Sequence, residues 1–436
     1  MIATLRVAIV GAGPAGFFLA EKLLSQADRP VAVDLYERLP VPYGLVRFGV
    51  APDHEKIKAV TRSFDKVAAR PGFRFFGNVE VGRDLSVDQL RQAYDAVAFT
   101  TGAQSDRRMG IPGEDLGNSH PATEFVAWFN GHPDFRDRHF NLDAENVAVV
   151  GVGNVAVDVA RILSRSPEEL AKTDIADHAL EALRHSQVKN VYLLGRRGPA
   201  QAAFTTPEVK ELGEMALADA VALPHEVALD PLSAAEVAAD DDPSLKRKIE
   251  VLTQFAARAP SGKPKRLTLR FLVSPTELID DGHGRVAAIR LAHNRLVAKN
   301  GSLAAEPTGE SETLPVGLVF RSVGYRGTPI PGLPFDEKTG TIPNVGGRVA
   351  HGLYVAGWIK RGPNGVIGTN KPDAAATAEA ILADCQTPSA EPRAPSTELD
   401  WSGWQRINAA EVALGQAAGR PRVKFTSIED MLHAAR

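Results

Sequence analysis

Apolar and polar stretches alternate over the first hundred residues in a way that predicts strands and helices in turn. Short apolar runs at Val7–Val10, Val31–Tyr36 and Ala96–Thr101 have the length of buried strands. A helical pattern starts at Pro14, and a second predicted helix covers Glu55–Ala69. Buried strands that alternate with helices are typical of a parallel sheet covered on both faces. The pattern therefore predicts an α/β fold.

The same alternation begins again beyond residue 104. Asn146–Val150 and Val188–Leu194 are predicted strands, and a helix is predicted between them from about Val155 to Ser164. The other predicted strands are Phe73–Phe76, Val79–Val81, Leu267–Val273, Thr276–Ile279, Val286–Ala292, Leu314–Val323 and Gly352–Gly357. The Pro-rich stretch Thr387–Pro395 is predicted to be a linker, between a helix over about Pro372–Asp384 and a helical tail over Trp401–Arg436.

A glycine-rich turn follows the first predicted strand. Gly11 permits the tight turn, Gly13 lets the backbone approach a pyrophosphate, and Gly16 lets the helix pack closely on the strand. Pro14 suits the first turn of that helix, whose free N–H groups attract phosphate. The second strand ends at Glu37, a carboxylate placed to accept hydrogen bonds from a ribose. The sequence predicts a dinucleotide site here.

A second glycine motif follows the strand at Asn146–Val150. It has Gly151, Gly153 and Ala156 at the three positions, and the next strand ends in Arg196 and Arg197 instead of an acid. Paired guanidinium groups can bind a 2′-phosphate, which a carboxylate would repel. The alternative is an exposed arginine pair on a loop. We expect FAD at the first motif and NADP at the second, as in a flavin reductase.

Composition narrows the class of protein further. The 436 residues are enough for two or three domains, and a net charge of −3 predicts no nucleic-acid partner. No apolar run approaches the roughly 18 residues of a membrane span. The first strand starts close to Met1, so we expect no signal peptide and a cytoplasmic protein. Cys385 is the single cysteine, which excludes a Cys-x-x-Cys redox pair, and the histidines lack metal-ligand spacing.

Several distinctive motifs occur in order along nearly the whole chain. They are Tyr43–His54, Gly153–Asp158, Gly195–Gly198, Val323–Tyr325 and Gly357–Asn370. In these motifs the chain resembles the ferredoxin–NADP reductases of the adrenodoxin reductase type. The resemblance implies two Rossmann-like dinucleotide-binding domains, with an NADP domain (104–326) inserted into an FAD domain made of 1–103 and 327–436.

The resemblance also implies an activity. Family members pass hydride from NADPH to FAD and then single electrons to an iron–sulfur ferredoxin. Two alternatives stay open: an electron-input flavoprotein like the glutamate synthase small subunit, and a non-enzymatic redox sensor that binds both nucleotides. The first would need a cysteine-rich cluster-binding sequence, which this chain lacks. A thioredoxin reductase is excluded by the single cysteine.

The resemblance assigns roles to particular positions. Together with the turn residues Gly11, Gly13, Pro14 and Ala15, the implied FAD contacts are Glu37, Leu45, Val81, Trp358, Gly365, Val366 and Ile367. The implied NADP contacts are Arg107, Val152, Gly153, Asn154, Val155, Arg196, Arg197 and Glu208. His54, Asp158 and Glu211 match polar, catalytic positions. The alternatives are that His54 caps a helix and that Trp358 is a core residue.

A basic zone lies in the second half of the chain. It comprises Lys246, Arg247, Lys248, Arg258, Lys263, Lys265, Arg266 and Arg270. Since electron-carrier ferredoxins are acidic, we expect the ferredoxin to dock near Lys246, Arg247 and Lys248. The alternative is a solvated helix face.

Overall fold

The computed structural model describes residues 4–259, 261–386 and 399–436, and the predicted linker Thr387–Pro395 lies outside these ranges. The described chain divides into two compact units. The first unit comprises the described residues of 1–105, 130–136 and 324–436, and the inserted unit comprises 106–129 and 137–323. The short segment Asn130–Arg136 lies within the range expected for the inserted domain but belongs to the first unit. The chain therefore passes between the units four times.

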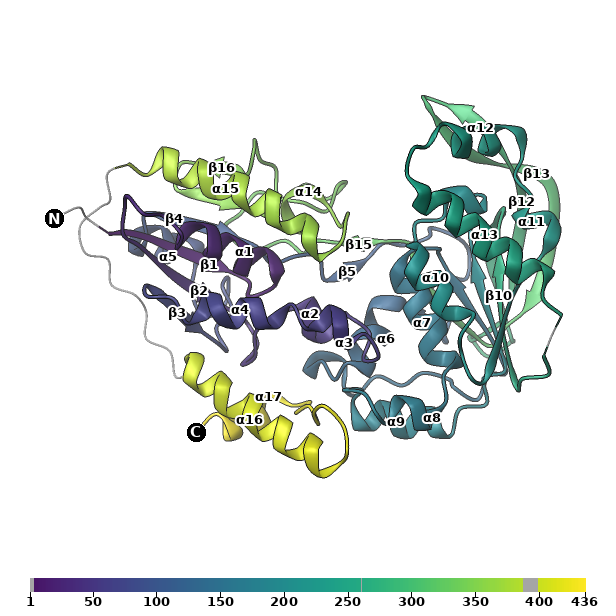
Figure 1. Cartoon of the computed structure of the whole chain (residues 1–436), viewed down its shortest axis with the longest axis horizontal. Coiled ribbons are helices and arrows are strands. Elements are labelled where there is room, and N and C mark those ends of the chain that lie inside the picture. The colour runs from purple at the N-terminus through teal and green to yellow at the C-terminus, as the bar shows by residue number, and fades with distance from the viewer. Residues whose placement is uncertain (1–3, 260, 387–398) are drawn as a thin grey trace. The chain divides into compact units, whose positions relative to one another are not determined.

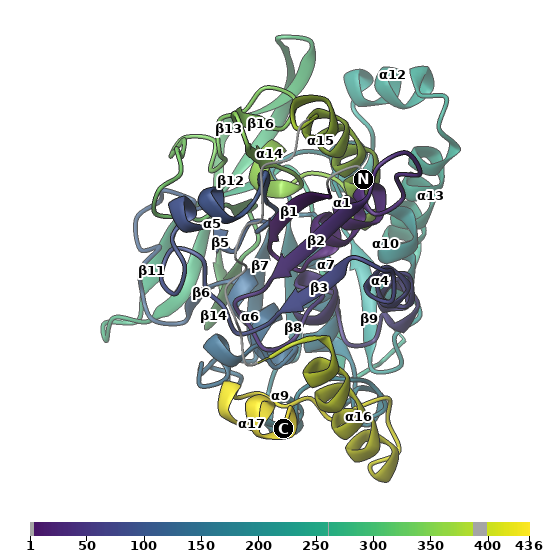
Figure 2. The same ribbon diagram turned by 90° about the vertical axis from the view of Figure 1, so that its left-hand side faces the viewer.

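A six-stranded sheet forms the centre of the first unit. In spatial order its strands are β16 (Arg348–Ala350), β17 (Leu353–Val355), β4 (Ala96–Phe99), β1 (Leu5–Val10), β2 (Val31–Tyr36) and β3 (Phe73–Phe76). All neighbours are parallel except β16 and β17. Figure 2 shows β1, β2 and β3 side by side. The chain order reverses beside β1, since β2 and β3 follow on one side and β4 lies on the other. Such a switch point is where α/β sheets bind ligands.

Strand β1 is buried on both faces, which explains its continuous apolar run. Val7 and Ile9 belong to one hydrophobic cluster, whereas Ala8 and Val10 belong to another on the opposite face. The helices of the first unit are α1 (Pro14–Leu23), α2 (Leu45–Phe48), α3 (Glu55–Lys58), α4 (Thr61–Ala68), α5 (Val87–Ala93), η1 (Pro133–Phe135), α14 (Trp358–Arg361), η3 (Ile367–Thr369), α15 (Asn370–Asp384), α16 (Trp401–Ala417) and α17 (Ile428–Ala434). Most are labelled in Figure 1.

Two details of the first unit differ from the prediction. The helix expected over Glu55–Ala69 forms as two helices, α3 and α4. Between them the N–H groups of Val60 and Arg62 donate to carbonyls three residues back, those of Ile57 and Ala59, as in a 3₁₀ turn. The strand expected at Val79–Val81 is absent from the described elements, and Val81 forms only an isolated bridge with Leu85.

The inserted unit repeats the architecture with a second six-stranded sheet, all parallel. Its strands in spatial order are β6 (Ser119–Pro121), β14 (Leu318–Arg321), β7 (Asn146–Val150), β8 (Asn190–Leu194), β10 (Lys265–Arg270) and β9 (Ala218–Ala222). Its helices are α6 (Ala122–Phe129), α7 (Asn154–Ser164), α8 (Pro167–Leu170), α9 (Asp177–Arg184), η2 (Pro199–Gln201), α10 (Thr206–Leu212), α11 (Pro224–Val227), α12 (Pro231–Ala239) and α13 (Pro243–Ala257). The predicted α/β class with two Rossmann-like sheets is confirmed.

A separate antiparallel sheet of three strands completes the inserted unit. Its strands are β11 (Val273–Asp280), β12 (Val286–Lys299) and β13 (Ser302–Pro315). The short strands β5 (Ser105–Asp106) and β15 (Tyr325–Arg326) pair near the points where the chain leaves and re-enters the first unit. Among the helices that the structure describes, none has the length and apolar character needed to cross a membrane.

Candidate nucleotide-binding sites

The turn between β1 and α1 needs glycine at two positions and is open at a third. Gly11 has φ +107°, and a Cβ there would lie 2.8 Å from the carbonyl oxygen of Thr100. A Cβ on Gly16 would lie 2.2 Å from the carbonyl oxygen of Gly11, so only glycine lets α1 pack this closely. A Cβ on Gly13, the N-cap residue of α1, would meet no atom within 4 Å. The open space lies where a pyrophosphate would approach the helix N-terminus.

Glu37 lies beside this turn, directly after β2. Its carboxylate accepts hydrogen bonds from the backbone N–H groups of Ala12 at 2.9 Å and Leu39 at 3.2 Å. Burial raises the pKa of Glu37, although the two backbone donors oppose that shift. The carboxylate is thus fixed against the glycine turn, as the ribose role predicted from its position requires.

The loop after Glu37 folds back onto the same turn. The N–H of Tyr43 donates to the carbonyl of Ala12 at 2.8 Å. A Cβ on Gly44 would lie 3.1 Å from the Cα of Gly13, so the two glycines are in close contact. Leu45, an implied FAD contact, starts the short helix α2 immediately afterwards. α2 is the part of this loop that is helical.

The C-terminal glycine-rich block also reaches the start of α1. A Cβ on Gly357 would lie 2.7 Å from the Cβ of Ala15, so two parts of the chain that are distant in sequence are in close contact here. Trp358 is partly exposed, and its indole N–H donates to the carbonyl of Asn364 at 3.1 Å. It is therefore not a core residue. Val366 is 59% exposed, so this end of the block offers surface to a ligand.

Two further implied contacts, Pro14 and Val81, lie in the same unit. Pro14 is the first residue of α1. Val81 is buried in a cluster with Val10 and Tyr36, the last residues of β1 and β2. Gly365 has φ +82° and precedes η3, which starts at Ile367. All the implied FAD positions belong to the first unit, and their contact with FAD remains a prediction.

The turn between β7 and α7 repeats the geometry of the first. Gly151 has φ +129°, and a Cβ there would lie 2.2 Å from the carbonyl oxygen of Ser322. Gly153, the N-cap residue of α7, is open in the same way as Gly13. Ala156 is fully buried at the third position, where its methyl group is accommodated. The second turn thus fits a pyrophosphate as well as the first does.

This second turn also holds the segment before α10. The carbonyl of Val152 accepts from the N–H groups of Ala203 and Phe204, both at 2.9 Å. The side-chain oxygen of Asn154 accepts from the N–H of Thr205 at 2.9 Å. Asn154 therefore fixes the start of α10 in addition to its implied NADP role, and Val155 follows it on α7.

A fully buried arginine joins α7 to α10. Arg161 has a side chain that is 0% exposed, and it donates to Asp158 at 2.7 Å and to Glu208 at 3.4 Å. Asp158 and Glu208 were predicted as site residues, but Arg161 was not. A charged residue three positions after Asp158, in an otherwise apolar helical run, is the signal that could have identified it.

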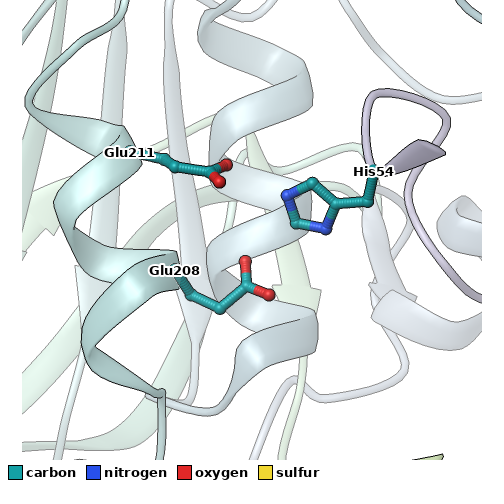
Figure 3. Close-up of side chains that lie close together, drawn as sticks. All are labelled: His54, Glu208 and Glu211. Atoms are coloured by element: carbon teal, nitrogen blue, oxygen red, sulfur yellow. The ribbon is translucent and has the colours of Figure 1, made fainter. Parts of the chain in front are cut away.

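Glu208 and Glu211 share one side of α10. Figure 3 shows both carboxylates projecting in the same direction, as their spacing predicts. The third side chain labelled in Figure 3, His54, belongs to the first unit. His54 is the N-cap residue of α3, but its side chain makes no capping hydrogen bond. The alternative that His54 caps the helix is therefore wrong, and the residue is buried.

The predicted 2′-phosphate residues follow β8. Arg196 is exposed and Arg197 is half-buried, and the carbonyl of Arg196 accepts from the side chain of Asn294 at 2.9 Å. The backbone is thus anchored while the guanidinium of Arg196 stays at the surface. Arg107, exposed, lies in the same unit, one residue after β5.

The basic zone is less exposed than expected. Lys248 is buried and donates to the carbonyl of Ala202 at 2.6 Å, so its predicted docking role is wrong. It occupies the apolar face of α13 together with Leu252 and Phe255, and burial lowers its pKa. Arg270 is likewise buried, paired with Glu226 and Glu312. Lys246 and Arg247 are exposed.

Comparisons with known proteins agree with this geometry. A family model described as pyridine nucleotide-disulphide oxidoreductase matches residues 5–210. The NADPH-ferredoxin reductase FprA of Mycobacterium tuberculosis is 48% identical, over 98% of each chain. The chain belongs to the NADPH–ferredoxin reductases of the adrenodoxin reductase type.

Two other relatives of this reductase family support the assignment. Human mitochondrial NADPH:adrenodoxin oxidoreductase is 41% identical over 98% of this chain and 91% of its own. The solved structure of Mycobacterium tuberculosis FprA in complex with NADPH has a TM-score of 0.93 at 46% identity, covering 99% of this chain and all of that one. The resemblance inferred from the motifs is thus confirmed.

Proposed function

We propose that this reductase passes hydride from NADPH to a bound FAD and then single electrons to an iron–sulfur ferredoxin. The observation that carries the proposal is the pair of glycine turns. Each turn is open at its middle glycine, and the strand next to it is followed by a charged residue, negative for the first turn and positive for the second. In the first turn the open glycine is Gly13, and Glu37 follows the neighbouring strand β2; in the second it is Gly153, and Arg196 follows the neighbouring strand β8. Two different dinucleotides fit these two turns. The similarity to the NADPH-ferredoxin reductase FprA extends over 98% of each chain.

The first unit would hold FAD. The N-terminus of α1 at Gly13 attracts the pyrophosphate, and Glu37 accepts hydrogen bonds from the ribose hydroxyls. Leu45, Val81, Trp358 and the block at Gly365–Ile367 would surround the rest of the cofactor. When bound, FAD supplies the chemistry that accepts two electrons as hydride and releases them one at a time.

The inserted unit would hold NADPH. The N-terminus of α7 at Gly153 attracts its pyrophosphate, while Arg196 and Arg197 bind the 2′-phosphate. Glu208 would orient the nucleotide, and Arg161, which donates to it at 3.4 Å, would hold that carboxylate in place. This arrangement gives the chain its preference for NADPH over NADH.

The polar residues would support proton and substrate positioning. Asp158 is held by Arg161 at 2.7 Å, so its role is to fix that guanidinium. Glu211 projects from α10 in the same direction as Glu208 and would act in the same polar group. His54 would relay a proton or orient a neighbouring group.

The test is the visible absorption spectrum of the purified protein before and after NADPH. We expect flavin absorption that bleaches rapidly on mixing with NADPH, together with cytochrome c reduction that depends on added ferredoxin. A colourless preparation that takes up no FAD on reconstitution would contradict the proposal. A yellow protein that bleaches slowly or not at all would support the redox-sensor alternative.

We propose that the ferredoxin docks near Lys246 and Arg247. Both side chains are exposed at the start of α13, and a positive surface attracts an acidic electron carrier. The double variant Lys246→Glu and Arg247→Glu should raise the KM for ferredoxin about tenfold at low salt and leave ferricyanide reduction unchanged. Lys299→Glu with Lys338→Glu, which reverses two exposed charges elsewhere, is the matched control. Equal loss in both assays would remove these residues from the docking surface.

We also propose a cytoplasmic location. The lone cysteine, Cys385, is buried and unpaired with any other cysteine, which fits a reducing compartment. Cell fractionation followed by immunodetection is the measurement that checks it.

A further inference from the structure

A buried carboxylate in the C-terminal helix α16 meets the loop that would contact FAD. Glu411 is 0% exposed and accepts two hydrogen bonds from Arg47, at 2.5 and 3.0 Å. It also accepts from the side chain of Arg422 at 3.1 Å and from the N–H of Phe425 at 2.9 Å. The carboxylate thus has donors on both oxygens, as an ionised group needs when water is excluded.

Arg47 lies within α2, which has little of its own to fix its orientation. The helix has four residues, and its N-cap residue Gly44 has no side chain to cap it. So short a helix is not stable by itself, and its position depends on tertiary contacts. The buried fork between Arg47 and Glu411 supplies such a contact.

Two more contacts connect the C-terminal segment to the same loop. The indole N–H of Trp404 donates to the hydroxyl of Tyr43 at 3.3 Å. The ammonium of Lys424 lies 3.4 Å from the carbonyl oxygen of Arg47. The Tyr43 N–H in turn donates to the carbonyl of Ala12 in the glycine turn. α16 therefore reaches the pyrophosphate turn through one intervening layer of residues, although Figure 1 shows it at the far end of the colour scale from β1.

We propose that Glu411 is a positioning residue of the flavin site, which fixes α2 through Arg47 and so places Leu45 and the turn at Gly13 for FAD. The inference rests on the proposed binding of FAD by the first unit. A carboxylate that only stabilised the fold could be replaced, with Arg47, by apolar side chains at little cost. A positioning carboxylate could not, because the apolar pair would not specify the orientation of α2.

The test is the rate at which FAD leaves the protein, followed by the rise in flavin fluorescence on release. Glu411→Gln keeps the shape but removes the charge, and we expect FAD release at least tenfold faster, with an altered visible circular dichroism of the bound flavin. Glu429→Gln, at an exposed position on α17 in the same segment, is the matched control and should release FAD at the wild-type rate.

A triple variant separates positioning from stability. Arg47→Met with Glu411→Leu and Arg422→Met, which removes all three charged side chains together, should recover most of the thermal midpoint of the apoprotein but not FAD retention. If this variant retains FAD like the wild type, the pair is only structural and the inference is overturned. If Glu411→Gln fails to fold, the same measurement is made on Arg47→Lys, which keeps the positive charge but loses the two-pronged hydrogen bond. An unchanged rate of FAD release in that variant overturns the inference. A wild-type protein without flavin would instead reject the proposed function.

Discussion

At the residue scale, the two positions predicted to bind ribose carry opposite charges. Glu37 is held by two backbone donors, whereas Arg196 keeps its side chain exposed and only its backbone anchored. We expect Arg196→Ala with Arg197→Ala to raise the KM for NADPH at least tenfold, because each lost charge-assisted bond is worth about 1.5–3 kcal/mol. The KM for NADH should barely change. Steady-state ferricyanide reduction with both nucleotides checks this, and an unchanged ratio of the two KM values would reject the assignment.

The buried Arg161 gives a second prediction at this scale. Arg161→Gln removes the buried cation that pairs with the buried Asp158 and the half-buried Glu208. Removing one partner of a buried ion pair costs about 3–5 kcal/mol. Urea unfolding followed by far-UV circular dichroism should show this loss. Arg184→Gln, which removes an exposed pair with Glu181 on α9, should cost about 0.5 kcal/mol or less. Equal midpoints for the two variants would contradict the prediction.

Single residues were predicted from the sequence only where a motif fixed their position. Three such residues are Gly13, Gly153 and Glu37. They follow strands at the spacing of the dinucleotide-binding motif, and this spacing predicted their places in the fold. Lys248 was misjudged because a lysine counts as polar, although its aliphatic part lies in the apolar stripe of α13. Arg161 was missed because its burial depends on pairing with Glu208 on another helix as well as with Asp158 on its own.

At the element scale, strands with continuous apolar runs were predicted well and polar ones were not. β2, β3 and β7 have the bounds that were expected. β13 was missed, because Ser302–Pro315 contains Pro307 and three glutamates and is a strand only through its pairing with β12. The strand expected at Val79 fails since its N–H donates to the carbonyl of Glu37, a bond outside any ladder.

The glycine turn of the first unit yields a prediction about two neighbouring glycines. Gly13→Ala should leave the fold intact, because a Cβ there meets no atom within 4 Å, and should weaken FAD binding by filling that space. Gly16→Ala should instead destabilise the fold, since its Cβ would lie 2.2 Å from the carbonyl of Gly11. Thermal unfolding of the two apoproteins, together with FAD titration, checks this. A stable Gly13→Ala variant that binds FAD normally would contradict it.

At the scale of the whole molecule, the resemblance implies the two units and their approximate borders, but not the return of Asn130–Arg136 to the first unit. The FAD and NADP assignments of 1–103, 104–326 and 327–436 remain predictions. The segment Asn130–Arg136 joins the first unit through tertiary contacts, such as Arg38 with Asp134 at 2.7 Å. No local pattern in the sequence indicates such contacts.

Each unit contains a histidine that should make it sensitive to acid. Burial, together with the nearby charges of Arg321 and Arg138, lowers the pKa of His120, in the inserted unit, to about 4. Burial also lowers the pKa of His132, in the first unit, to about 4. The unfolded chain binds these protons near pH 6.5, so stability is full above that pH and is lost as pH falls towards 4. After allowance for partial exposure, each should cost about 1 kcal/mol at pH 5.

The measurement is the thermal midpoint at pH 7.5 and at pH 5. His120→Phe should reduce the drop between the two pH values, because His120 packs against Phe140 and Phe320 and a phenyl ring fits there. His283→Gln, at an exposed turn, should leave the drop unchanged. Identical drops in wild type and His120→Phe would exclude His120 as a source.

The short segment from Asn130 to Arg136 governs how this protein can be dissected. A gene fragment that deletes 106–323 to obtain the flavin half alone would also delete Asn130. The ammonium of Lys424, 5% exposed, donates to the carbonyl and side chain of Asn130, and Lys58 donates to the same side chain. In that half-molecule Lys424 would keep the carbonyl of Arg47 as an acceptor but lose both acceptors on Asn130, so a usable fragment must retain 130–136 on a tether between the two cut ends.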